Sequence, residues 1–432
     1  MDSPKPKHSG SLKERKAIIS WCLFDWANSP HPTIVLTFVF SAYFIKVVAN
    51  NEILGTFLWS QAIGLSSLLV VILAPILGAI SDQTGRKKLW VLIFTLISIF
   101  ATFSLWFVAP NTNTLPLALI GVSISVISFE ICNIFYNATL SHVSHYRTIG
   151  RISGFAWGTG YFGAILCLLL CLFGLVKTPP SFLNLNTEQA EHIRATVILV
   201  GIWWLTFSWP FFVFVKEIEP QTVTKKSAVL TALRNLLGTL KKLKHYQSVT
   251  LFLLARMFYA DGLVVVFQFG GIYAAGTFGL TFEEILQFGI GMNISAGVGA
   301  FLLAWFDDRL GSKFIIILSL TGLIVTGTAL LWVESVDWFW LWGIGMSFFI
   351  GPTQAASRTL LARLTPQAIH GEMYGLFALS GKATSFTGPM LFGWLVLIFE
   401  NQRAGMAIAI LFWTIGLMLV LFVKQKDERI TQ

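Results

Sequence analysis

Residues 53–88 read ILGTFLWSQAIGLSSLLVVILAPILGAISDQTGRKK, and this stretch decides the fold. Residues 53–81 carry no charged side chain. They therefore exceed the roughly 20 apolar residues that a helix needs to cross a bilayer. Asp82 ends the run and the bases Arg86, Lys87 and Lys88 follow it closely. The stretch is typical of a membrane-crossing helix that ends in a basic loop.

The whole chain of 432 residues has the same character. Apolar types make up 55% of it and charged types 12%, whereas an ordinary soluble domain is about 25% charged. So few charges exclude a soluble globular protein, a disordered chain and a collagen-like repeat. A β-barrel would show short alternating segments instead of long apolar runs. We therefore predict an all-α membrane protein.

The apolar runs predict twelve spans in two six-helix bundles. We expect the spans at 18–44, 55–80, 89–109, 115–140, 152–176, 195–215, 248–275, 283–306, 314–333, 338–362, 373–398 and 403–424. The longest polar stretch lies between the sixth and seventh spans and separates the two bundles. The expected parts are a tail (1–17), a bundle (18–215), a linker (216–247), a second bundle (248–424) and a tail (425–432).

Lysine and arginine are distributed unequally between the two sides of the predicted membrane. With the N-terminus inside, the cytoplasmic segments carry 24 of these bases, the opposite side carries four, and two lie within spans. The positive-inside rule then places both termini in the cytoplasm. The same rule explains the net charge of +9 without a nucleic-acid partner. The short loops and the chain length favour a bacterial inner membrane.

The loop after the second span has a partner in the second half of the chain. Asp82 precedes Gly85 by three residues, and Asp308 precedes Gly311 by three residues, at an offset of 226. A base follows within two residues of the glycine in each copy. The two halves are thus predicted to be related parallel repeats.

Four further motifs lie in predicted spans. They are Phe24-Asp25-Trp26-Ala27-Asn28-Ser29, Arg151-Ile152-Ser153-Gly154, Ala255-Arg256-Met257-Phe258-Tyr259-Ala260-Asp261-Gly262 and Ser380-Gly381-Lys382-Ala383-Thr384. With the Asp82 loop, these motifs resemble the major facilitator superfamily and, within it, the vacuole-effluxer (autophagy-related) family. The resemblance runs from about Trp21 to Lys424. Ala260 and Pro30-His31-Pro32 depart from the family pattern.

This resemblance implies twelve helices, a central cavity between the bundles, and transport by alternating access. It also implies that spans 1, 4, 7 and 10 line the cavity and that spans 2, 5, 8 and 11 form the contact between the halves. Small residues four apart on those latter spans would let helices approach closely. They are Ala74/Gly78, Gly154/Gly158, Gly291/Ser295/Gly299 and Gly381/Ser385.

Charged and amide side chains within the spans are the candidate site. A charge at the bilayer centre costs about 2.5–3.5 kcal/mol or more, so it marks a functional position by default. The candidates for substrate binding or coupling are Asp25, Asn28, Glu130, Asn133, Asn137, Arg256, Asp261 and Lys382. Helical spacing places Asp25 with Asn28 on one face, and Glu130 with the other two amides on another.

Two interpretations of these charges remain open at this point. In the first, these residues bind the substrate, couple its transport to an ion, or control the opening of the cavity. In the second, they form structural ion pairs that hold the bundles together. We expect Lys382 to pair with a carboxylate, most simply Asp261. Three acids against two bases leave one carboxylate that can take up a proton. Glu130 is the first candidate for that coupling group and Asp25 the second.

The loop residues are candidates for gating between the halves. They are Gly78, Asp82, Gly85, Arg86, Lys87, Asp308 and Arg309. Plain positive-inside topology is the alternative explanation for their bases. Within span 1, Pro30 and Pro32 remove helical hydrogen bonds. Either a tolerated kink results, or a broken helix presents His31 to the cavity.

Several patterns are rejected as catalytic or cofactor sites. Gly158–Gly163 spells GxGxxG, but it lies inside a span and follows no strand, so it indicates helix packing. The four cysteines also lie within apolar runs and no metal cluster accompanies them. We expect no cofactor, no metal and no enzymatic activity.

The function predicted from these observations is secondary transport of a small polar solute. The family resemblance implies an amino-acid-like solute and export, and the surplus carboxylate suggests protons as the coupling ion. Nucleosides, peptides, siderophores and sugars stay open as solutes. The alternative class is a non-transporting membrane protein, either a receptor or an intramembrane enzyme. We expect a monomer whose other partner is membrane lipid.

Overall fold

The computed structural model describes residues 12–84, 86–143, 149–177, 183–216, 246–365, 373, 376–377 and 379–424. Every regular element in these ranges is helical. Ten helical segments there are long and apolar enough to cross a membrane. The long helix α13 (Val336–Leu364) and the interrupted helix that ends in α15 (Thr387–Phe399) supply the tenth and eleventh spans. The protein is therefore an all-α membrane protein with twelve helical spans.

The first six spans contain both regular and widened helix. Their elements are α1 (Leu12–Asn28), η1 (His31–Phe38), α2 (Phe40–Tyr43), η2 (Phe44–Val48), α3 (Glu52–Thr84), α4 (Lys87–Ser104), η3 (Leu105–Phe107), η4 (Thr112–Thr114), α5 (Leu115–Ala138), α6 (Leu140–Val143), α7 (Ile149–Cys171), η5 (Leu172–Val176) and α8 (Glu191–Phe214).

The last six spans contain no π-helix in the part of the chain that the structure describes. Besides α13 and α15, they are α10 (Gln247–Phe278), α11 (Phe282–Leu310), α12 (Ser312–Trp332) and α16 (Gln402–Phe422). The predicted boundaries are close to these, except that α1 begins six residues before the expected position 18. The expected linker falls almost wholly outside the described residues.

The two prolines of span 1 widen the helix instead of ending it. His31–Phe38 forms a π-helix, in which Val39 N–H donates to Ile34 O at 2.9 Å. Proline has no N–H to offer, so the α-helical bond is lost locally. The wider turn lets the backbone continue, and Thr37 donates its hydroxyl hydrogen to the Pro32 carbonyl at 3.0 Å. Of the two alternatives, the structure therefore shows a tolerated local distortion and not a broken helix.

Span 11 is interrupted where the sequence reads Gly381-Lys382-Ala383. Residues 381–386 form turns, and α15 begins only at Thr387. Gly381 N–H still donates to Phe377 O, whereas Ser385 N–H turns back to Lys382 O at 3.1 Å. A helix broken at membrane depth exposes backbone groups that a continuous helix would satisfy.

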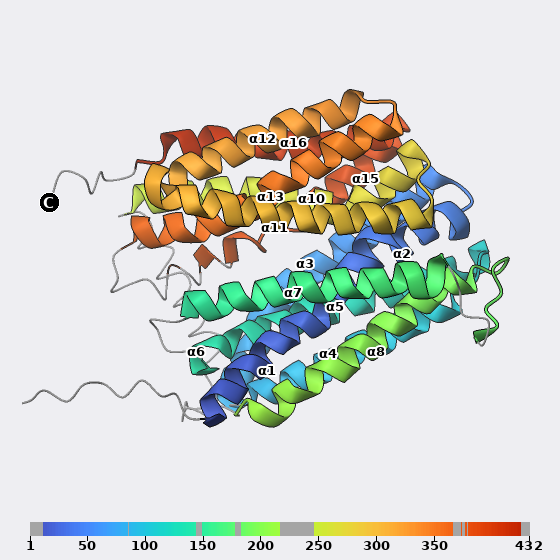
Figure 1. Cartoon of the computed structure of the whole chain (residues 1–432), viewed down its shortest axis with the longest axis horizontal. Helices are drawn as coiled ribbons and strands as arrows, with labels where there is room; N and C mark the ends of the chain where they lie inside the picture. Colours follow the sequence, from blue (N-terminus) through green and yellow to red (C-terminus); the bar gives the residue numbers. More distant parts are fainter. Residues whose placement is uncertain are drawn as a thin grey trace, which may run out of the picture.

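The helices form two groups, which Figure 1 shows one above the other. In the first, α1 packs on α7 and α8, and α4 packs on α5. In the second, α10 packs on α16, and α13 packs on α11 and α12. The groups meet through α3 with α15, α7 with α11, and η1 with α10. Spans 2, 5, 8 and 11 therefore take part in the contact, as the resemblance implies, and spans 1 and 7 also meet there.

Small residues explain that contact only in part. A Cβ on Gly393 would overlap Ser60 Oγ, and one on Gly64 would lie 2.6 Å from Met390 Cγ, so α3 and α15 approach through other glycines than those expected. Gly299 faces the Phe348 carbonyl of α13, within its own half. The expectation that the stripe on span 8 lies between the halves is therefore wrong.

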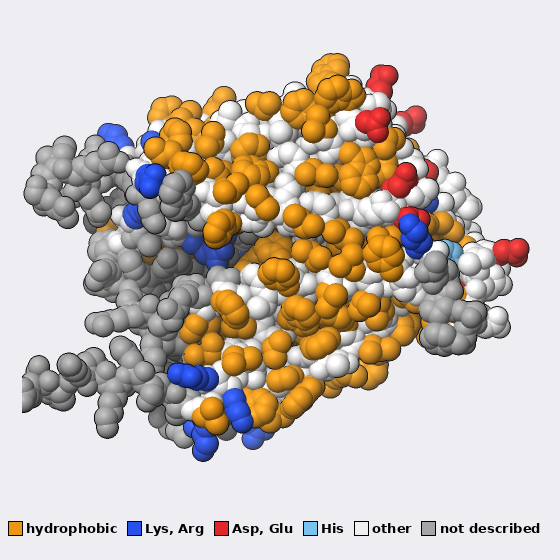
Figure 2. All heavy atoms as spheres, in the orientation of Figure 1, with side chains coloured by type: hydrophobic (Ala, Val, Ile, Leu, Met, Phe, Trp, Pro, Cys, Tyr) orange, Lys and Arg blue, Asp and Glu red, His pale blue; other side chains and the backbone are white. Residues whose placement is uncertain are grey.

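Side-chain charge divides the surface lengthwise. Figure 2 shows hydrophobic side chains over the middle, lysine and arginine gathered at the end where α1 begins and α16 ends, and aspartate and glutamate at the opposite end. Many large apolar side chains of the middle are exposed, Phe301 and Trp332 to 80%. Such a surface fits hydrocarbon contact between two polar ends. We call the two ends the base-rich end and the acid-rich end.

Candidate functional site

Two of the predicted polar faces meet inside the first half. Asn28 Nδ2 of α1 donates to Asn133 Oδ1 of α5 at 3.0 Å. One turn further along α5, Tyr136 donates its hydroxyl hydrogen to the Trp21 carbonyl at 2.7 Å. The same hydroxyl lies beside the Asp25 carboxylate. Spans 1 and 4 thus form one joined polar surface. Helical spacing predicts the polar face of each span separately.

The charges of Glu130 and Lys382 meet between the two halves. Lys382 Nζ donates to Glu130 Oε2 at 2.5 Å, with side chains 49% and 24% exposed respectively. The predicted pairing of Lys382 with Asp261 is therefore wrong. Because Glu130 is on α5 and Lys382 is on the break of span 11, this ion pair must separate whenever the halves part at this level.

Arg256 and Asp261 both lie on α10 and bind different parts of span 11. Arg256 Nη1 donates to the Phe377 carbonyl at 2.5 Å and to Ser380 Oγ at 3.0 Å, and its guanidinium lies 3.5 Å from the centre of the Phe377 ring. Asp261 Oδ2 accepts from the Thr387 hydroxyl at 2.9 Å. The two α10 side chains therefore hold the segments before and after the break.

Two polar residues lie apart from this arrangement. Asn137, the last amide of the predicted α5 face, is exposed. His31 is fully buried inside the first half, with Nε2 at 2.5 Å from Ser125 Oγ and its ring stacked on Phe129. The hypothesis that a broken span 1 presents His31 to the cavity is therefore wrong, since packing encloses the ring.

The predicted gating loops are described only in part. Arg86 is exposed and Lys87 is half-buried at the start of α4. The surroundings of Gly78, the side chains of Asp82 and Asp308, and the whole of Gly85 lie outside what the structure describes, and Arg309 is exposed.

In the second copy of the loop, Asp307 makes contacts that the sequence pattern did not predict. Asp307 Oδ1 pairs with Arg363 of α13 at 3.2 Å and accepts from Ser312 Oγ at 2.7 Å. Gly311 beside them has φ +88°. The repeat pointed to Asp308 because of its spacing to that glycine, and Asp307 next to it is buried.

Polar contacts join the halves at the acid-rich end. Lys177, after η5, forms an ion pair with Glu283 of α11 at 3.0 Å. Lys46 Nζ of η2 donates to the Leu280 carbonyl at 2.7 Å. The sequence does not identify these charges near the helix ends as contacts between the halves, since nothing in their spacing distinguishes them from solvated residues. Together with the α3–α15 packing, they close this end of the molecule.

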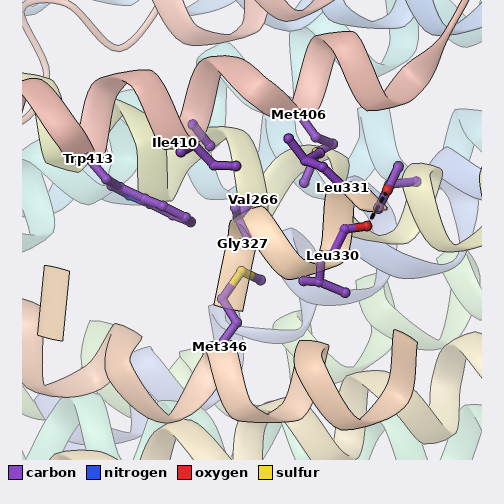
Figure 3. Close-up of a pocket in the computed structure, with 10 residues that line it drawn as sticks. Val266, Gly327, Leu330, Leu331, Met346, Met406, Ile410 and Trp413 are labelled. Carbon is purple, nitrogen blue, oxygen red and sulfur yellow. Dashed lines mark hydrogen bonds between the residues drawn. The ribbon is translucent and has the colours of Figure 1, made fainter. Parts of the chain in front are cut away.

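An apolar cavity inside the second half is not the solute site. Figure 3 shows the side chains around it, from α10, α12, α13 and α16. The cavity has room for little more than one water molecule. The Tyr273 hydroxyl in its lining is already engaged, since it donates to the Leu330 carbonyl at 2.9 Å. Among the described residues, no three His, Cys, Asp or Glu side chains gather as metal ligands.

Known protein sequences are similar to this chain over most of its length. A family model described as "Vacuole effluxer Atg22 like" matches residues 58–149 and 141–432. An uncharacterized MFS-type transporter, YxiO of Bacillus subtilis, is 24% identical, with 95% of each chain covered. Autophagy-related protein 22 of Yarrowia lipolytica is 21% identical over 69% of this chain, which spans 55% of that protein's length.

Solved structures agree in fold. The xylose transporter XylE from E. coli, in a partially occluded inward-open conformation, matches with a TM-score of 0.68 at 15% identity, over 96% of this chain and 99% of that one. The nucleoside transporter NupG matches with a TM-score of 0.63 at 14% identity, over 95% and 98%. The two-bundle architecture is thus that of the major facilitator superfamily.

Proposed function

The chain belongs to the vacuole effluxer Atg22-like family of major facilitator transporters, and from this premise we propose that it exports a small zwitterionic, amino-acid-like solute by alternating access. It is a transmembrane transporter and not an enzyme. The observation that carries the proposal is the ion pair of Glu130 with Lys382 between the halves. Each half contributes one charge of this pair.

The chemistry of that pair favours a solute with both charges. When the halves part, the carboxylate and the ammonium each lose their partner, so each charge needs a new one of opposite sign. An amino acid replaces both partners at once, with its ammonium on Glu130 and its carboxylate on Lys382. A sugar or a nucleoside would leave both charges unpaired. The bonded amides Asn28 and Asn133 supply hydrogen bonds on the same side as Glu130.

Coupling to protons is part of the proposal, with Asp25 as the coupling group. The ion pair with Lys382 removes the reason for placing the surplus carboxylate at Glu130. Asp25 has no ion-pair partner among the described residues, and the Tyr136 hydroxyl lies beside it. Because a carboxylate without a base nearby favours its neutral form in apolar surroundings, it can take up a proton and release it when water enters.

The proposed orientation places the base-rich end in the cytoplasm. The segregation of bases and acids to opposite ends supports this assignment (Figure 2), by the positive-inside rule. Both termini and the linker (216–247) then lie inside, between bundles 18–215 and 248–424. The likeness to YxiO over 95% of both chains supports a bacterial inner membrane. We propose a monomer, because one chain supplies both charges of the site.

Counterflow in proteoliposomes tests the function. Vesicles that hold purified protein are loaded with one unlabelled solute and given the same solute in radiolabelled form, across amino acids, peptides, nucleosides, siderophores and sugars. We expect exchange of one or more amino acids. Glu130→Gln should lose it, while Lys424→Gln, a change of an exposed base just after α16, should keep it. Exchange of only uncharged solutes by the parent would contradict the proposal.

A further inference from the structure

The segment that breaks span 11 lies against a buried carboxylate. Asp261 of α10 is 2% exposed, and Oδ2 accepts from the hydroxyl of Thr387, the first residue of α15. The Thr384 side chain, in the last part of the break, also faces Asp261. Three oxygen-bearing side chains from two helices therefore converge at one point beside the break.

Two of these oxygen atoms, Asp261 Oδ1 and Thr384 Oγ1, are buried and have no hydrogen bond to any third group within the described part of the chain. The Thr384 hydroxyl lies beside the Asp261 carboxylate. Buried polar atoms in folded proteins are nearly always satisfied, so an exception needs an explanation. The nearest base on α10, Arg256, is committed to Phe377 and Ser380 on the other side of the break. The ion pairs of the described residues also include none with Asp261.

We propose that Asp261, Thr384 and Thr387 bind a sodium ion at the break of span 11. Carboxylate, hydroxyl and carbonyl oxygens are the ligands that hard cations prefer. Broken helices in transporters supply unwound carbonyl groups for such ions, and residues 381–386 form turns instead of regular helix here. A single carboxylate balances one positive charge, whereas a divalent ion would leave an excess charge in apolar surroundings.

The ion would act on the solute site through Lys382. Lys382 lies two residues before Thr384 in the same turns, where its carbonyl accepts from Ser385 N–H at 3.1 Å. A cation held by Thr384 and Thr387 would fix the conformation of this segment. It would thereby fix the position of the Lys382 ammonium relative to Glu130. Sodium and solute would then bind with a shared coupling free energy, so each changes the affinity of the other by the same factor.

Thermal unfolding of the purified full chain in detergent, in a sodium chloride series balanced with choline chloride, tests the site. The apparent melting temperature of the parent should rise with sodium and saturate, and potassium should not replace it. Asp261→Asn should abolish the rise. Thr384→Ala should weaken the apparent sodium affinity roughly tenfold, and Thr384→Ser, which restores the hydroxyl, should recover it.

Matched controls separate a site from a general salt effect. Thr414→Ala removes a hydroxyl of the same half that bonds only the Ile410 carbonyl of its own helix, and it should leave the sodium response unchanged. If Asp261→Asn does not fold, the Thr384 variants decide alone. Equal stabilisation by choline or potassium, or an unchanged response in the Thr384→Ala variant, would overturn the proposal. A parent that is stabilised by acid and unaffected by sodium at any pH would assign Asp261 to a proton instead.

Discussion

The Glu130 carboxylate and the Lys382 ammonium are 252 residues apart in sequence and 2.5 Å apart in space. They lie on helices of opposite halves, and both are partly open to solvent. A partly exposed pair contributes only modestly to stability. The pair matters because it lies between the two halves. The alternating-access movement of the halves must break it, and the solute must then provide replacement partners.

Charge reversal tests whether this contact exists in the folded protein. Glu130→Lys sets two bases against each other, and Lys382→Glu sets two acids against each other, so each should lower the free energy of unfolding by about 1 kcal/mol. The double change restores opposite charges and should recover at least half of the summed loss. Thermal unfolding in detergent measures it. Losses that simply add would show that the side chains do not meet.

Removal of the carboxylate at position 25 should uncouple transport from protons. Asp25→Asn keeps the size of the side chain but cannot titrate. We expect the variant to exchange solute across proteoliposomes at near-parental rate and to lose accumulation driven by an imposed pH gradient. Glu188→Gln, at an exposed acid of the acid-rich end, is the matched control. Parental accumulation by Asp25→Asn would assign coupling to another group.

The approach of α3 to α15 should depend on the absence of a side chain at Gly393. A Cβ there would overlap Ser60 Oγ and lie 2.9 Å from Ser60 Cβ, so Gly393→Ala should destabilise the protein by about 1–3 kcal/mol and slow transport. Ser60→Gly should rescue part of both losses. Gly158→Ala, where a Cβ would meet nothing within 4 Å, is the control and should be neutral. A tolerated Gly393→Ala would refute the close contact.

Cysteine labelling checks the orientation in the membrane. Single cysteines at Lys225, in the linker outside the described residues, and at Glu188 are introduced into a chain without the native cysteines. An impermeant thiol reagent added to intact cells should modify position 188 only, because the base-rich end faces the cytoplasm. Modification of position 225 from outside would invert the topology.

Most of the fold follows from the sequence because the bilayer imposes a length and an apolar composition on every span. Helical spacing likewise brings Asn28 and Asn133 to faces that meet. The spacing of residues within one helix does not show how a helix in the other half is rotated about its axis or shifted along it. That is why the sequence did not identify Glu130 as the partner of Lys382.

Binding of modified amino acids tests the central claim that a zwitterion takes over the pair of Glu130 and Lys382. For an amino acid that exchanges, the parent should lose roughly tenfold or more in affinity on N-acetylation or on methyl esterification, as expected for a charged hydrogen bond. Glu130→Gln should become indifferent to N-acetylation alone, and Lys382→Gln to esterification alone. Full parental discrimination in both variants would contradict the account.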